Sequence, residues 1–219
     1  AQVAAEVRDA SGLWPLHLTG TGQAPGQRNQ EVTASGDVLL LCGPTAVGKS
    51  TVGFHTANYL WQSEAKAGYI DLQELQFVRP PLPTSALNAY RAANLRAAWA
   101  TFQQQGAQRL VVSGPFARPE DLDAVQEGLS GCDVHACRLE ATREALAGRM
   151  EERLAPGGPH LAGNALRGAT VAERERQLEA TLLEAQNCTR WSAGTTVDTT
   201  DQPLGETFGA VLRARGWLA

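Results

Sequence analysis

The stretch Gly43-Pro44-Thr45-Ala46-Val47-Gly48-Lys49-Ser50-Thr51 decides the fold, because it matches the phosphate-binding pattern G-x-x-x-x-G-K-[S/T]. Gly43 and Gly48 allow the backbone to turn tightly and to bring its N–H groups against phosphate oxygens. Lys49 can reach the β- and γ-phosphates of a nucleotide, and the Ser50 hydroxyl can ligate Mg²⁺. A helix that begins here points the positive end of its dipole at the anion. The whole stretch is therefore predicted to bind nucleotide phosphates.

The residues on either side of this loop have the pattern that such a loop requires. Residues 37–42, Asp-Val-Leu-Leu-Leu-Cys, predict a short buried strand of a parallel sheet. Residues 51–63 predict a helix with Val52 and Leu60 among the side chains available for packing. Strand, loop and helix follow one another in the order that the motif needs, and this agreement is independent of the motif itself.

Strands and helices are predicted to alternate along the rest of the chain. The predicted strands are 37–42, 68–71, 109–114, 132–139 and 195–198, and the predicted helices are about 51–63, 85–105, from Pro119 onward, 142–154, 170–187 and 203–216. This alternation indicates an α/β fold in three layers, with a five-stranded parallel sheet between helices. Ligands of such sheets bind at the carboxyl ends of the strands.

The length of the chain suits one large domain with an extension. The chain has 219 residues, and residues 37–219 form the predicted domain. Residues 1–36 stand apart and contain a polar, turn-rich segment at 20–27, so they are predicted to be a flexible N-terminal extension.

The composition of the chain indicates which partners and which cellular compartment to expect. The net charge of −4 argues against a general nucleic-acid surface. Only Lys49 and Lys66 among the 19 basic residues are lysines. The four cysteines show no zinc spacing and are read as reduced thiols. No apolar run has the length of a membrane span, and the start of the chain lacks a signal-peptide pattern, so a cytoplasmic protein is expected.

Missing motifs and a late arginine-bearing loop indicate which class of phosphate-loop protein this is. No N-K-x-D motif of GTPases occurs, and the third predicted strand ends Val111-Val112-Ser113-Gly114 rather than in the Asp-Glu of motor-type and recombination-type ATPases. Over about residues 37–217 the chain resembles the nucleoside-monophosphate-kinase-like group of P-loop small-molecule kinases. That group includes shikimate and gluconate kinases, chloramphenicol phosphotransferase and tunicamycin-resistance-type ATP-binding proteins; residues 94–99 and 110–114 look most like the last. The resemblance implies a P-loop NTPase sandwich with a helical lid at about 149–170.

The resemblance also implies roles for residues at the strand ends. Relatives place a carboxylate after the second strand, facing acceptor and metal, and Asp71 holds that position. Asp71 can accept the proton of the acceptor hydroxyl or hold Mg²⁺ through water, and a turn aspartate is the other interpretation. Ser113 replaces the aspartate that many relatives carry after the third strand. Metal ligation is therefore assigned to Ser50 and Asp71.

Arg149 and Arg153 lie four residues apart, so they share one helix face. In the resembled kinases, arginines at the start of the lid contact ATP and stabilise charge on the transferring phosphoryl group. Arg149 and Arg153 are therefore predicted to be catalytic, with Arg149 also binding the nucleotide. Solvated salt bridges to Glu151 and Glu152 are the alternative.

One arginine falls on an apolar face of the predicted helix 85–105. Arg91 lies between Leu87 and Leu95 on the same arc, and Asn94 lies at its edge. Such an arginine either extends its head to solvent or faces a cleft. Because the third helix lines the acceptor site in the resembled group, Arg91 and Asn94 are predicted to bind substrate together with Asp71 and Ser113.

These residues predict an ATP- and Mg²⁺-dependent kinase that moves the γ-phosphoryl group to a hydroxyl of a small molecule. The preferred acceptor is an antibiotic or a nucleoside-like natural product, with resistance or self-protection as the purpose. A nucleotide kinase is a second interpretation. A nucleotide-binding switch or sequestering protein without transfer activity is a third, because Ser113 stands where an acidic residue is common. No nucleic acid or membrane is expected as a partner.

Overall fold

The structure is a computed structural model that describes residues 35–114, 116, 119–153, 169–188 and 194–218. The predicted extension up to residue 34 and the central part of the predicted lid, 154–168, lie outside the described residues. The strands are β1 (Asp37–Cys42), β2 (Ala67–Asp71), β3 (Arg109–Ser113), β4 (Asp133–Glu140) and β5 (Thr195–Asp198). The helices are α1 (Lys49–Gln62), α2 (Thr84–Gln104), α3 (Pro119–Gly128), α4 (Arg143–Glu152), α5 (Val171–Cys188) and α6 (Leu204–Arg215), with a 3₁₀ turn η2 (Glu74–Gln76).

The strands form one parallel sheet in the order β2-β3-β1-β4-β5, which confirms the predicted fold class. β1 is the central strand, and its side chains from Val38 to Cys42 are buried on both faces, as its continuous apolar run predicts. The register places Asp37 beside Arg109 and Asp133 at the edge where the strands begin. It places Asp71 beside Ser113 at the edge where the strands end.

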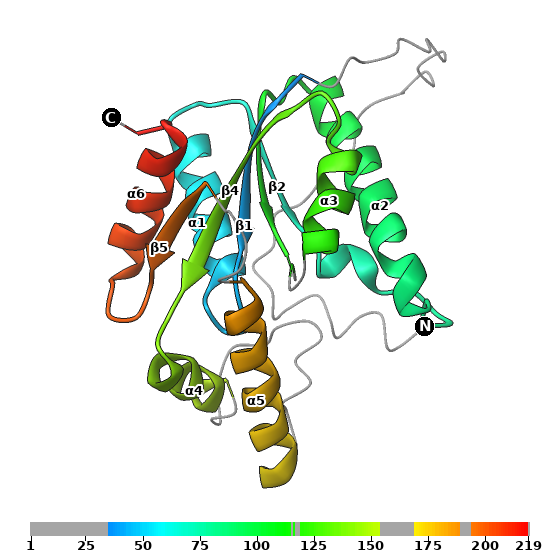
Figure 1. Ribbon diagram of the computed structural model, residues 1–219. Coiled ribbons are helices and arrows are strands. Elements are labelled where there is room, and N and C mark those ends of the chain that lie inside the picture. Colours follow the sequence, from blue (N-terminus) through cyan, green and yellow to red (C-terminus); the bar gives the residue numbers. More distant parts are fainter. Residues whose placement is uncertain (1–34, 115, 117–118, 154–168, 189–193, 219) are drawn as a thin grey trace, which may run out of the picture. The chain divides into compact units, whose positions relative to one another are not determined.

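Two apolar cores lie on opposite faces of the sheet. Leu39 and Leu41 of β1 pack in the core that includes residues of α1 and α6. Val38 and Leu40, the alternating residues, pack in the core that includes Leu95 and Trp99 of α2. Figure 1 shows α1 and α6 on one side of the strands and α2 and α3 on the other. The fold is therefore the predicted three-layer sandwich.

All strands run in the same direction, so the segments that follow them meet at one edge of the sheet. The loop after β1 lies there, and α4 and α5 extend beyond this edge in Figure 1. A capping box precedes α5, in which Thr170 Oγ accepts the N–H of Glu173 (3.3 Å) and the Glu173 carboxylate accepts the N–H of Thr170 (2.7 Å). No helix in the described ranges is long and apolar enough to cross a bilayer.

Candidate functional site

The loop after β1 has the backbone conformation that its glycines predict. Gly43 has φ 138° and Gly48 has φ 103°, both in the region that side chains disfavour. A Cβ at Gly43 would lie 2.4 Å from the carbonyl oxygen of Leu139, so this position requires glycine for space as well. Gly48 is the N-cap of α1, which therefore begins at Lys49 rather than at the predicted Thr51.

The ammonium group of Lys49 lies within the loop. Its Nζ donates to the carbonyl oxygens of Gly43 (2.9 Å) and Pro44 (2.8 Å). The loop thus holds a positive charge beside the first turn of α1, whose backbone N–H groups and dipole favour an anion. Lys49 and the N-terminus of α1 together form a ready site for phosphate.

Arg149 connects α4 to this loop. Its Nη1 donates to the Val47 carbonyl oxygen (3.4 Å) and to Thr199 Oγ (2.9 Å), and its Nη2 donates to the Thr199 carbonyl oxygen. Thr199 is 4% exposed, and its hydroxyl lies 3.3 Å from the Val47 oxygen and 3.1 Å from the Glu140 oxygen. The predicted lid arginine therefore lies against the phosphate loop, and Thr199 joins the ends of β4 and β5 to the same place.

Arg153 follows one turn later and caps α4. Burial, and then the nearby charge of Arg149, lowers the pKa of the Arg153 guanidinium. Within the described residues no ion pair joins Arg149 or Arg153 to Glu151 or Glu152, which are exposed. The Arg153 guanidinium therefore lies near that of Arg149, which contacts the loop.

Tyr69 brings together three of the predicted site residues. Its hydroxyl donates to the carbonyl oxygen of Ser50 (3.1 Å) and lies 2.9 Å from Ser113 Oγ. Since that proton is used on Ser50, the Ser113 hydroxyl is the donor to Tyr69. Burial raises the pKa of Tyr69 to about 12, with the nearby Asp71 carboxylate adding to the shift. Ser50, Asp71 and Ser113 thus gather around one phenol.

Asp71 makes the turn that ends β2. Its Oδ1 accepts the backbone N–H of Gln73 at 2.9 Å, the geometry of a turn aspartate. Asp71 also lies beside Ser113 in the sheet register, at the strand end where the sequence places it. The structure therefore meets the turn interpretation and keeps the carboxylate beside the other predicted metal and acceptor residues.

Arg91 and Asn94 attach α2 to the turn η2. Arg91 is 9% exposed, and its Nε and Nη2 both donate to Oε1 of Gln76, the first at 2.9 Å. Asn94 donates to the carbonyl oxygen of Leu75 at 2.8 Å. Nη1 of Arg91 reaches Asn88 at 3.3 Å. The two predicted substrate-binding side chains thus position the segment that follows Asp71, and direct substrate contact stays a prediction.

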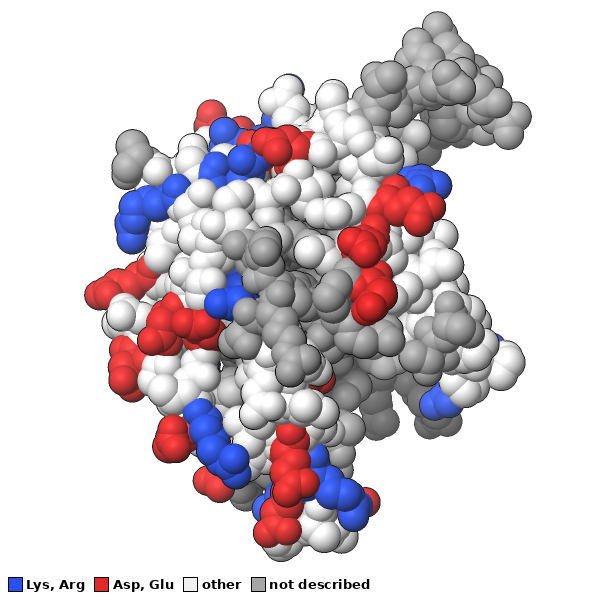
Figure 2. Space-filling model, in the orientation of Figure 1, with Lys and Arg blue, Asp and Glu red and all other residues white. Residues whose placement is uncertain are grey.

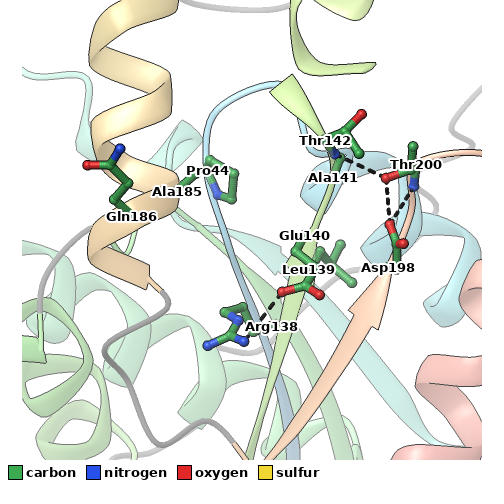
Figure 3. Close-up of a pocket in the computed structure, with 10 residues that line it drawn as sticks. All are labelled: Pro44, Arg138, Leu139, Glu140, Ala141, Thr142, Ala185, Gln186, Asp198 and Thr200. Atoms are coloured by element: carbon green, nitrogen blue, oxygen red, sulfur yellow. Dashed lines mark hydrogen bonds and ion pairs between the residues drawn. The ribbon is translucent and has the colours of Figure 1, made fainter. Parts of the chain in front are cut away.

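The outer side of the loop borders a cavity of about 360 Å³. Its lining, drawn in Figure 3, consists of Pro44, Arg138, Leu139, Glu140, Ala141, Thr142, Ala185, Gln186, Asp198 and Thr200. Asp198 accepts both the N–H (2.8 Å) and the hydroxyl (2.6 Å) of Thr200, and these bonds lower the pKa of the Asp198 carboxyl. The cavity therefore lies between the end of α5 and the ends of β4 and β5.

Glu184 of α5 reaches the loop from this side. Its Oε2 accepts the backbone N–H of Thr45 and the Thr45 hydroxyl, each at 2.8 Å. α5 and α4 thus contact the loop at Thr45 and Val47, respectively.

The sequence did not point to Tyr69 or Glu184, or to the contact of Thr199 with the loop. Tyr69 had a usable signal, because it lies two residues before Asp71 and therefore on the same face of β2. Thr199 and Glu184 carry no local pattern that marks them. Within the described ranges, no three His, Cys, Asp or Glu side chains gather in a way that could hold a metal ion.

Charges of both signs are interspersed on the face of the described residues that Figure 2 shows. No large patch of one sign covers that face.

Comparison with known proteins shows similarity at the level of structure alone. No protein-family model and no curated protein matches this sequence. A sugar kinase from Janibacter sp. HTCC2649 has a TM-score of 0.55 at 15% identity, over 81% of this chain and 93% of that chain. The tunicamycin resistance protein of Deinococcus radiodurans has a TM-score of 0.53 at 17% identity, over 84% and 97%. A gluconokinase from Sinorhizobium meliloti 1021 has a TM-score of 0.50 at 21% identity, over 82% and 91%.

Identities this low relate folds rather than activities. The five-stranded parallel sheet, its flanking helices and the loop after β1 agree with the expectation from sequence. The chain has the fold of the P-loop small-molecule kinases.

Proposed function

We propose that this protein is an ATP- and Mg²⁺-dependent phosphotransferase whose acceptor is the hydroxyl of a small molecule. The observation that carries the proposal is the arrangement at the carboxyl edge of the sheet. Lys49 lies inside a phosphate loop, Arg149 contacts that loop from α4, and Asp71 ends the strand two positions away in the sheet. This supplies groups for phosphate, for developing charge and for an acceptor proton.

The phosphate loop would bind the nucleotide through its N–H groups, the α1 dipole and the Lys49 ammonium. Arg149 and Arg153 would stabilise charge on the transferring group, since Arg149 contacts the loop and its charge acts on that of Arg153. Neither role needs covalent chemistry from the protein, because phosphoryl transfer depends mainly on positioning and electrostatics.

The residues present suit Mg²⁺. This ion is commonly held by one or two protein oxygens together with substrate phosphates, and Ser50 and Asp71 offer such oxygens. The link from Ser50 through Tyr69 to Ser113 fixes the backbone of the first of these residues. When bound, Mg²⁺ would neutralise charge on the β- and γ-phosphates.

Asp71 is the proposed general base. It would orient the acceptor hydroxyl and accept its proton while the oxygen bonds to phosphorus and the bond to the ADP oxygen breaks. Arg91, Asn94 and Ser113 are proposed to shape the acceptor side; the first two do so at least by fixing residues 74–76. The preferred acceptor class is an antibiotic, a nucleoside-like natural product or a sugar derivative. Similarity to structures named for tunicamycin resistance and for sugar and gluconate kinases supports that choice.

A non-catalytic nucleotide-binding protein is the second candidate. The observation that favours it is Ser113, which is fully buried and hydrogen-bonded to Tyr69 where many kinases of this fold carry an acid. A protein that binds nucleotide through Lys49 and changes shape would need no base.

The deciding experiment is an acceptor screen. The protein is incubated with ATP, Mg²⁺ and a library of hydroxyl compounds that also contains nucleoside monophosphates. The mass of each compound is then measured by mass spectrometry. A gain of one phosphoryl group on an alcohol supports the proposal, whereas a gain on a nucleoside monophosphate identifies a nucleotide kinase. A parallel incubation with a non-hydrolysable ATP analogue is the control. Tight ATP binding without transfer to any compound would favour the non-catalytic candidate.

A further inference from the structure

A carboxylate of the protein itself occupies donors of the phosphate loop. A single oxygen, Oε2 of Glu184, accepts both the backbone N–H and the hydroxyl of Thr45 at 2.8 Å. Thr45 is the third residue of the motif that begins at Gly43. Backbone N–H groups of such loops bind anionic oxygens, and a carboxylate oxygen, like a phosphate oxygen, is an anionic hydrogen-bond acceptor.

The position of Glu184 on its helix explains how it reaches the loop. Thr181, three residues earlier, is fully buried, and Ala185 lines the cavity beside Pro44. Glu184 lies on this inward side of α5, whereas Glu179 and Leu183 are exposed. Glu184 is therefore presented to the loop by the packing of α5.

Resting on the proposed nucleotide-binding function, we propose that Glu184 is an internal competitor of the nucleotide's phosphate chain. A phosphate oxygen that takes the Thr45 donors must displace the Glu184 carboxylate, because two anions that accept from the same donors repel each other. Binding of ATP thereby releases the C-terminal end of α5 from the loop. Glu184 sets the affinity for ATP and links its arrival to α5.

The first test compares ATP affinities of the full-length protein and two variants. Glu184→Gln keeps the shape of the side chain and removes its charge, so ATP with Mg²⁺ should bind about tenfold more tightly by calorimetry, since charge-assisted hydrogen bonds are roughly twice as strong as neutral ones. Glu179→Gln, an exposed glutamate on the same helix, is the matched control and should leave the affinity unchanged. Tripolyphosphate as a probe should show the same gain, because the competing group is the phosphate chain.

The second test uses the wild-type protein and does not depend on a variant that folds. Hydrogen exchange should become faster at about residues 181–187 when ATP is added, and slower at the loop amides. An unchanged or weaker affinity in a folded Glu184→Gln protein, or slower exchange in α5 with ATP, would overturn the proposal and make Glu184 a fixed support of the loop.

The two proposals fail in different ways. If the wild-type protein binds ATP while Glu184→Gln shows no gain and α5 stays protected, only the role of Glu184 is wrong. If neither protein binds ATP or tripolyphosphate, both the proposed kinase function and the proposed role of Glu184 are wrong.

Discussion

The two edges of the sheet satisfy their polar groups in different ways. At the edge where the strands begin, Arg215 of α6 pairs with Asp37 and with Asp133, the latter at 2.5 Å. The Trp217 indole donates to Asp37 at 2.6 Å and lies under the guanidinium groups of Arg109 (5.4 Å) and Arg215 (6.0 Å). Side chains bind side chains here, and they join α6 and the segment after it to three strands.

At the opposite edge, charged side chains bind groups of the loops. Lys49 donates to two loop carbonyls, Arg149 donates to the Val47 and Thr199 carbonyls, and Glu184 accepts from Thr45. A ligand with its own oxygens can replace such partners. The comparison predicts that the contacts at the first edge serve mainly stability, and it agrees with the proposal that a ligand binds at the second.

Lys49→Ala should give the largest effect and should affect the ligand edge alone. Loss of a positive charge aimed at the transferring group should lower turnover by about 10³-fold or more. The melting temperature should stay within about 2 °C of wild type, because the hydrogen bonds of the ammonium to the Gly43 and Pro44 carbonyls join neighbouring residues of one loop. Turnover and thermal unfolding are the measurements.

The matched control is Lys66→Ala, which removes the other lysine of the chain, just before β2 at the opposite edge. Near-wild-type turnover of a folded Lys49→Ala protein would contradict the kinase proposal.

Asp71→Asn should lower turnover by about 10²–10⁴-fold, the usual contribution of a general base, while ATP affinity changes much less. Glu74→Gln, an exposed carboxylate in η2, is the control. If Asp71 mainly holds the metal, the variant should instead need more Mg²⁺ and be partly rescued by excess Mg²⁺ or Mn²⁺. Turnover measured against metal concentration separates the two roles. If neither the turnover nor its dependence on metal concentration changes, Asp71 is a turn residue only.

Arg215→Met should have the reverse profile. Losing two ion pairs and a contact with the Trp217 ring should lower the free energy of unfolding by about 1–3 kcal/mol. ATP affinity should not change, because Arg215 lies at the other edge of the sheet. Denaturant unfolding and calorimetry are the measurements, with the exposed Arg213→Met on the same helix as control. A variant that loses ATP affinity at full stability would break the division between the edges.

Tyr69→Phe should give the smallest effect, seen in alkaline solution. The folded pKa of Tyr69 is about 12 and the ordinary value is 10.0, so its protonated phenol stabilises the fold fully below pH 10. That contribution is lost as the pH rises through 12, and the Phe variant should lose less stability over this range. Cys137, whose pKa burial also raises to about 12, keeps part of the slope in the variant. Denaturant unfolding at pH 9 to 12 measures the free energy of unfolding of both proteins. If this free energy falls equally steeply with pH in wild type and variant, the raised pKa of Tyr69 is contradicted.

Much of the fold follows from local pattern. The predicted strands 37–42 and 195–198 match β1 and β5 at both ends, because alternating or continuous apolar residues end at clear polar and glycine positions. Arg91 is buried on α2 as its place on the apolar arc implies. The start of α1 was predicted too late, since the residues after Gly48 already have helical geometry within the loop.

The candidate site was predictable only where a motif spells it out. Lys49 and Ser50 follow from the loop pattern, but Thr199 and Glu184 meet that loop across 152 and 139 residues of sequence. Contacts of this kind exist only after α5 and β5 have packed, and no spacing in the chain encodes them. In the sequence alone, a threonine after a strand and a glutamate on a charged helix cannot be distinguished from other residues of the same kind.

Ala46 has a consequence for which loop sequences the protein can tolerate. It adopts φ 65°, a left-handed conformation that costs a residue with a Cβ about 1–2 kcal/mol. Its methyl group is buried with Val47 and Val52, which returns about 0.8 kcal/mol. Glycine at this position would remove the cost of the left-handed conformation but also lose the buried methyl group. Alanine and glycine are therefore both compatible with the fold. In a library of randomised loops selected for activity, position 46 should therefore yield several small residues, whereas Gly43, whose Cβ would meet the Leu139 oxygen at 2.4 Å, should yield glycine alone.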